Sequence, residues 1–85
     1  MEVFNMNQYV EIIEKIMSDN NIFGDVVGYS DNMVEVEITW GDWKHEHARL
    51  RYLVLQQMQN VKNHEEITTE EDGSDCYSAI HRFTF

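Results

Sequence analysis

The chain has 85 residues, and its 16 acidic residues outnumber its 6 lysines and arginines, so its formal net charge is −10. This balance argues against direct binding to nucleic acid or anionic lipid, which depends on Lys and Arg side chains that neutralise phosphates. Hydrophobic residues make up 42% of the chain, more than a disordered acidic tail would contain. The length suits a single domain, residues 1–85, with one core.

Further classes of protein are disfavoured by short patterns. No apolar run approaches the roughly 20 residues that cross a bilayer, and the first residues lack the basic and apolar segments of a secretory signal. The single cysteine, Cys76, has no partner for an internal disulfide, which favours a reducing compartment. We therefore expect a cytoplasmic protein.

Helical spacing of apolar residues near the N-terminus predicts a helix over about residues 5–19. Asn5 is suited to cap its first turn, with Gln8 as the capping-box partner, and Asn20-Asn21 is expected to end it. The apolar stripe consists of Met6, Tyr9, Val10, Ile13, Ile16 and Met17.

A hairpin is predicted next. Residues 22–30 are rich in strand formers but are interrupted by Gly24 and Gly28, which indicates a bulged or bent strand. Asp31-Asn32 suits a two-residue turn. The following strand alternates strictly, with Val34, Val36, Ile38 and Trp40 on one face and Glu35, Glu37 and Thr39 on the other. This period of two predicts one buried face and one solvated face that carries carboxylates.

A second helix and a second hairpin complete the chain. The helix is predicted over about residues 43–63, and it holds four of the six basic residues, Lys44, Arg49, Arg51 and Lys62. Its apolar stripe consists of Trp43, Leu50, Val54, Met58 and Val61. A strand over 64–71, a turn at 72–74 and a last strand follow. The last strand has Tyr77, Ala79, His81, Phe83 and Phe85 on its apolar face.

Helices with one apolar stripe and strands with one apolar face are satisfied by two packed layers. We therefore predict an α+β fold of two layers in the order αββαββ. Its four-stranded, mostly antiparallel sheet has both helices on one face, and the other face is left to solvent or a partner.

The four histidines are candidate metal ligands. His45 and His47 point roughly 200° apart on the predicted helix, whereas helical zinc pairs need spacings of three or four. His64 and His81 can approach each other across the final hairpin, but we find no cysteine pair or carboxylate spacing that completes a site. Residues 68–79 resemble a calcium loop only in part, because Thr68 and Ala79 replace the acids of its first and last positions. We expect structural histidines, no metal and no cofactor.

Catalysis is not expected. Cys76 with His81 or His64 would make a thiol–imidazole pair, and carboxylates are plentiful, but no recognisable motif surrounds either. The chain also lacks a glycine-rich phosphate loop. We therefore expect that the protein is not an enzyme.

The distribution of acids is the most informative feature. Residues 63–76 contain six acids and no base, and on a strand Glu35/Glu37 and Glu66/Glu70 are expected to form rows on the solvated face. Like charges held in rows reduce stability, so their accumulation indicates either solubility or complementarity to a basic partner. The residues predicted to contact such a partner are Glu35, Glu37, Glu65, Glu66, Glu70, Glu71, Asp72 and Asp75.

Small size, net negative charge, absence of motifs and acidic runs such as Glu35-Val36-Glu37 and Glu70-Glu71-Asp72 resemble small phage-encoded anti-defence proteins. DNA-mimic inhibitors and anti-CRISPR proteins are the most similar in kind. The resemblance implies a non-catalytic inhibitor that binds a nuclease or another nucleic-acid-handling protein in the host cytoplasm. These proteins share no common fold or motif, so the resemblance assigns no role to an individual residue.

Two alternatives remain open. Immunity proteins that neutralise toxic nucleases are similar by the same criteria. A small adaptor or assembly protein, with a homodimer allowed, would use its acidity for solubility alone. The basic second helix departs from an entirely acidic mimic and leaves room for a second contact surface.

Overall fold

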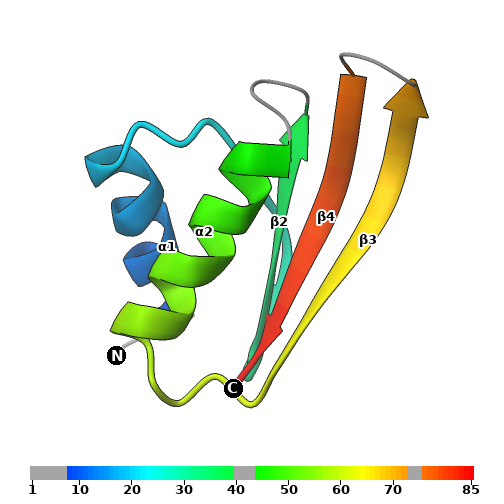
Figure 1. The fold of residues 1–85 in the computed structure, drawn as a ribbon. Coiled ribbons are helices and arrows are strands. Elements are labelled where there is room, and N and C mark those ends of the chain that lie inside the picture. Colours follow the sequence, from blue (N-terminus) through cyan, green and yellow to red (C-terminus); the bar gives the residue numbers. More distant parts are fainter. Residues whose placement is uncertain (1–7, 40–43, 73–75) are drawn as a thin grey trace.

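Two helices and four strands alternate along the chain in this computed structural model, which describes residues 8–39, 44–72 and 76–85. In chain order the elements are α1 (Gln8–Asp19), β1 (Asp25–Ser30), β2 (Met33–Thr39), α2 (Lys44–Gln57), β3 (Asn63–Asp72) and β4 (Cys76–Thr84). Both helices lie on the same side of the sheet (Figure 1). The α+β class and the αββαββ order are as the sequence predicts.

The sheet has the strand order β1-β2-β4-β3, and every neighbouring pair is antiparallel. β4, the last strand of the chain, is therefore internal, while β1 and β3 form the two edges. β3 is the strand farthest from the helices in Figure 1. β3, an edge strand of ten residues, therefore lies to one side of the two-layer core.

The core lies between the helices and the inner face of β2 and β4. The predicted alternation is confirmed, because Val34, Val36 and Ile38 of β2 are all buried. The core also includes Val10, Ile13, Ile16 and Met17 of α1, Leu50 and Val54 of α2, and Ala79 and Phe83 of β4. At one end the ring of Tyr9 stacks on that of Phe85, with centroids 4.0 Å apart.

α1 ends where the sequence predicts. Asn21 has a φ of 57°, the left-handed conformation that terminates many helices, and Asn tolerates it better than most residues. The Ile22 amide donates to the Met17 carbonyl at 2.9 Å, and the Asn21 amide donates to that of Ser18 at 3.4 Å. This pair of bonds is the Schellman motif, and Ile22 and Met17 are both buried beside it. The predicted cap at Asn5 lies outside the described residues.

The second helix is shorter than the sequence predicts, because α2 ends at Gln57 and not near residue 63. Met58 and Val61 still pack against the core, but they do so from the connecting segment. The predicted apolar stripe therefore combines residues of α2 with residues of the segment that follows it. The Lys62 amide donates to the Thr84 carbonyl at 2.7 Å, which directs the chain into β3. Neither described helix has the length and apolar character needed to cross a membrane.

Irregularities in the ladder occur on both edge strands. The register of β1 against β2 shifts between Val26 and Gly28, which confirms the predicted bulge, and Ser30 pairs with Met33 across the predicted two-residue turn. A second shift, between Thr68 and Glu70, interrupts β3 against β4. Residues beyond it change face, because side chains alternate along a strand with a period of two.

Candidate functional site

The carboxylates predicted as one partner surface are divided between the two faces of the sheet. Glu35 and Glu65 both pair with Arg82, so all three share the face away from the helices. Glu37 lies on this outer face too, opposite Ile80. The rest of the predicted set lies on β3 or beyond it.

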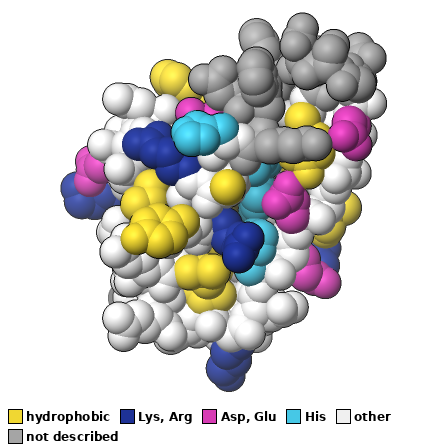
Figure 2. Space-filling model, viewed as in Figure 1, with side chains coloured by type: hydrophobic (Ala, Val, Ile, Leu, Met, Phe, Trp, Pro, Cys, Tyr) yellow, Lys and Arg dark blue, Asp and Glu magenta, His cyan; other side chains and the backbone are white. Residues whose placement is uncertain are grey.

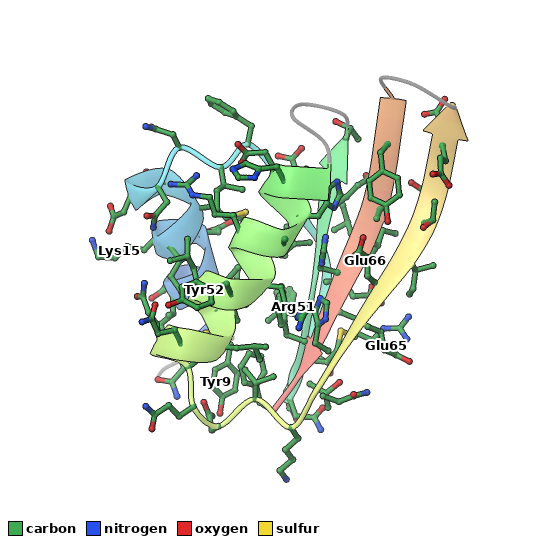
Figure 3. All side chains as sticks on the ribbon, in the orientation of Figure 1. Tyr9, Lys15, Arg51, Tyr52, Glu65 and Glu66 are labelled. Atoms are coloured by element: carbon green, nitrogen blue, oxygen red, sulfur yellow. The ribbon has the colours of Figure 1, made fainter. Side chains whose placement is uncertain are left out.

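Glu66 and Glu70 do not form the predicted row. Glu66 pairs with the buried His81 and lies on the helix side, whereas Glu70 pairs with Ser78 on the outer face. The cause is the extra residue at Thr69, which the sequence pattern did not indicate. Glu71 pairs with Tyr77, and the backbone of Asp72 pairs with that of Cys76, while Asp75 lies outside the described residues. Figure 3 shows Glu65 and Glu66 pointing to opposite sides of β3.

Arg82 is a cation in the acidic surface that sequence reasoning missed. Its Nε donates to Glu35 Oε2 at 2.8 Å, and its Nη1 donates to Glu65 Oε1 at 2.9 Å. These bonds, first to Glu35 and then to Glu65, raise the pKa of Arg82 above its usual value. The guanidinium therefore joins three strands and neutralises part of the outer face.

Edge strand β3 carries the main concentration of negative charge. Its sequence holds five acids and no base, and Glu65, Glu66, Glu70 and Glu71 are all exposed. Because of the shift at Thr69, Glu65 and Glu70 lie on the outer face while Glu66 and Glu71 lie on the helix side. The acidic side chains of β3 thus project from both faces of the sheet at this edge.

Three histidine rings form a row between α2 and β3. His47 of α2 is 1% exposed, His81 of β4 is completely buried, and His64 of β3 is half-buried. Nδ1 of His47 lies 2.7 Å from Nε2 of His81, and Nδ1 of His81 lies 2.9 Å from Nε2 of His64. Histidine side chains appear in Figure 2 in the recess between a basic and an acidic side chain. In Figure 3, Arg51 of α2 and Glu66 of β3 border this space.

A carboxylate and two hydroxyl groups adjoin the row. The Tyr77 hydroxyl donates a short hydrogen bond to Glu66 Oε2, and it lies 3.2 Å from Oγ1 of Thr68. The ring of Tyr77 also meets His47 edge to face, with centroids 4.7 Å apart. Ligand atoms of His47, Glu66 and His81 all lie within 4.8 Å of one another.

Burial sets the charge state of this cluster. It lowers the pKa of His81 to about 4, against the opposing effect of Glu66, and it also lowers the pKa of His47 and of His64. Burial alone would raise the pKa of Glu66, but the hydrogen bond from Tyr77, and the positive charge of the neighbouring imidazoles when they are protonated, bring that pKa below its usual value. At neutral pH the cluster therefore holds three neutral imidazoles beside an ionised carboxylate.

The hydrogen-bond chain leaves one buried atom without a partner. A neutral imidazole has one N–H donor and one lone pair, so the three rings must donate in sequence, either from His47 toward His64 or in the reverse direction. In both cases Nε2 of His47 lies at the end of the chain. It is buried and has no hydrogen-bond partner among the described residues. A buried polar atom left in this way costs about 1–3 kcal/mol, so the cluster is unlike a fully satisfied core network.

Sequence reasoning identified part of this cluster. The predicted approach of His64 and His81 is confirmed. The sequence spacing did not point to Glu66, which the register places directly opposite His81. The spacing of two residues predicts that His45 and His47 do not share a site, and His45 is exposed whereas His47 is buried. The missed signal is that His47 continues the buried stripe of Leu50 and Val54 at helical spacing.

The structure adds no support for the partial calcium loop at residues 68–79. Two of the three residues of the turn predicted at 72–74 lie outside the described residues, and so does the middle of the partial calcium loop. Thr68, its first position, has its hydroxyl beside that of Tyr77.

The chain matches no protein-family model, and no curated protein or solved structure shows a significant similarity to it. Its function is therefore argued from two features of the fold. One is the acidic edge strand β3, and the other is the cluster of His47, His64, His81 and Glu66.

Proposed function

We propose that the protein binds a positively charged surface of another protein through the acidic edge strand β3, and that this partner is a nuclease or another nucleic-acid-handling protein. The observation that supports the proposal is the composition of β3, with five acids and no base in an edge strand of ten residues. The protein would act by occupying the partner's nucleic-acid site, as an inhibitor without catalytic activity of its own.

The spacing of charge along β3 suits such a partner. The five acids lie between residues 65 and 72, a length of about 23 Å at roughly 3.3 Å per residue. This amounts to about one charge per 5 Å, compared with about one per 3.4 Å along a single DNA strand. The linear density of negative charge on β3 is therefore similar to that of the phosphates which a nucleic-acid-binding surface neutralises. Long-range attraction would also speed the encounter and make it sensitive to salt.

The competing interpretation is that the acids only protect an exposed edge. Edge strands present unpaired backbone groups, and charged side chains on them prevent pairing with another chain. In that case the position of the charges on β3 would matter for solubility but not for recognition. An experiment must therefore make the same change in net charge at two different places on the molecule.

The variant that tests the proposal is Glu70→Lys with Glu71→Lys. Both residues are exposed, and they lie on opposite faces of the edge. The matched control is Glu11→Lys with Glu14→Lys on the exposed side of α1, which changes the net charge by the same amount. Glu66 is left unchanged because it adjoins the histidines.

The measurement begins with capture from bacterial lysate at low salt, followed by purification of the captured protein and titration with wild type and both variants. We expect a nucleic-acid-binding partner that is released by salt and displaced by DNA. Reversal of Glu70 and Glu71 should weaken its binding at least about tenfold, since close charge pairs across interfaces contribute 1.5 kcal/mol or more. The α1 control should remain within about threefold of wild type. Equal affinities of the two variants, or a partner that DNA does not displace, would contradict the proposal.

The outward face of α2 favours a second candidate function, that of an adaptor or assembly protein. Tyr52 is 63% exposed and Leu55 is 38% exposed, beside a shallow depression that they line with Arg51. Figure 2 shows hydrophobic side chains together with basic ones over the helical side. For an adaptor, charge reversal at Glu70 and Glu71 leaves the interaction intact, whereas Tyr52→Ala weakens it.

A further inference from the structure

We propose that His47, Glu66 and His81 form a binding site for a divalent transition-metal ion, and that Zn²⁺ is the ion their ligand set fits. The inference does not depend on the proposed function, because it is argued from the convergence of three side chains and not from the charge of the edge, although Glu66 belongs to both groups. It assigns metal binding to a group whose histidines the sequence alone predicts to be structural.

The three ligands converge from α2, β3 and β4. Their ligand atoms already lie within 4.8 Å of one another. Zinc bound at 2.0–2.2 Å in a tetrahedral site keeps its ligand atoms about 3.4 Å apart. Nδ1 of His47 and Nε2 of His81, now 2.7 Å apart, would therefore separate by less than about 1 Å. Glu66 is exposed, and an inward movement of about 1.4 Å or less would bring its oxygen from within 4.8 Å of the other ligand atoms to this spacing.

Neighbouring groups hold two of the ligands in the orientation that a metal requires. His64 Nε2 lies 2.9 Å from Nδ1 of His81, so a proton on that Nδ1 leaves the lone pair of His81 Nε2 directed toward His47. The Tyr77 hydroxyl donates to Glu66 Oε2 and restrains its carboxylate. Metal-binding histidines and carboxylates in proteins are oriented by hydrogen bonds of this kind.

The unpartnered atom of His47 is an independent reason to expect an ion. With His81 protonated on Nδ1, His47 must donate from its own Nδ1, and its Nε2 is then a buried lone pair for which the described residues offer no donor. An ion bound at Nδ1 displaces that proton to Nε2, so the ring stays neutral and no proton is released. Metal binding would thus replace the contact between His47 and His81 and remove the unfavourable lone pair.

The ligand chemistry selects among ions. Two imidazoles and one carboxylate suit zinc and its neighbours in the first transition series, whereas Ca²⁺ and Mg²⁺ require six or more oxygen ligands. Three protein ligands leave a fourth tetrahedral position for water.

The test uses the full chain after treatment with a chelator. Zn²⁺ is titrated by calorimetry, and Co²⁺ is titrated by visible absorbance, which reports tetrahedral coordination. We expect one ion per chain, intense visible cobalt bands, a higher melting temperature with Zn²⁺, and no competition from Mg²⁺. Absence of Zn²⁺ binding up to millimolar concentration would overturn the proposal.

Matched variants locate the site. Glu66→Gln should weaken Zn²⁺ binding at least about tenfold, while Glu65→Gln, its neighbour on the opposite face of β3, should leave it unchanged. His47→Gln should abolish the cobalt bands, and His45→Gln on the exposed side of α2 should not. If His47→Gln does not fold, Zn²⁺ binding by Glu66→Gln compared with Glu65→Gln tests the location of the site. Equal binding by wild type and Glu66→Gln would place the ion elsewhere and refute the assignment.

Discussion

Asn21 shows how one residue ends α1 and begins the path to the sheet. Its φ of 57° lies in the left-handed region. Most residues avoid this region because their Cβ atom is crowded there, whereas glycine has no Cβ atom. The turn it makes allows the Ile22 amide to reach the Met17 carbonyl at 2.9 Å and places Ile22 in the core. The residue at this position therefore sets the stability of the helix end.

Substitutions of Asn21 should separate this conformational effect from side-chain contacts. We expect Asn21→Ala to lower the free energy of unfolding by about 1 kcal/mol, because alanine tolerates the left-handed region less well than asparagine. Asn21→Gly should be neutral or slightly stabilising, since glycine adopts this conformation freely. Urea unfolding followed by circular dichroism measures both. Equal effects of the two substitutions would show that the left-handed conformation is not the determinant.

At the scale of the elements, two glycines have different surroundings. A Cβ atom built on Gly24, in the loop between α1 and β1, would lie 3.1 Å from the carbonyl oxygen of Glu37 and 3.2 Å from Ile38 and Met17 side-chain atoms. A Cβ atom on Gly28, in β1, would meet Glu35 Oε1 at 2.6 Å, which is the end of a flexible side chain. The first contact involves the backbone and the core, whereas the second is relieved by rotation of Glu35.

Alanine substitutions should therefore differ at these two positions. Gly24→Ala is expected to lower the free energy of unfolding by about 1–3 kcal/mol, because the loop and β2 must move apart. Gly28→Ala should change it by less than about 1 kcal/mol, since alanine is also the better residue within a strand. Urea unfolding of the two variants beside wild type gives the comparison. A larger loss at Gly28 would mean that the contact of Glu35 with Arg82 is worth more than its exposure indicates.

At the scale of the whole molecule, the net charge of −10 opposes folding through self-repulsion. The described ion pairs of Arg82 with Glu35 and Glu65 act in the other direction, but all three side chains are partly exposed. Such pairs contribute only about 0.2–1 kcal/mol each. Repulsion should therefore be the larger electrostatic effect on stability.

Stability should increase with salt as a result. The Debye length falls from about 30 Å at 0.01 M to about 3 Å at 1 M, which screens repulsion across the whole molecule. We expect the melting temperature of chelator-treated protein to rise with NaCl over this range, and to rise less for the Glu70→Lys, Glu71→Lys variant. Differential scanning calorimetry measures both series. A melting temperature that falls with salt would show that the attractive pairs dominate.

The sequence by itself determined the class of fold and most of its elements. The alternation of Val34, Val36 and Ile38, and the stripe of Ile13, Ile16 and Met17, each report a local period that depends only on neighbouring residues. The end of α1 at Asn20-Asn21 is local for the same reason. Local patterns failed at the end of α2, where Met58 and Val61 kept a helical spacing in a segment that is not helical.

Only the tertiary structure decided what the acids and histidines can do. A single extra residue at Thr69 reverses every side chain after it, so the face of Glu70 depends on the pairing of β3 with β4 and not on spacing along β3. His47 and His81 are 34 residues apart, and they meet because α2 packs over the internal strand β4. Strand register and helix packing are long-range properties, and both candidate sites are built from them.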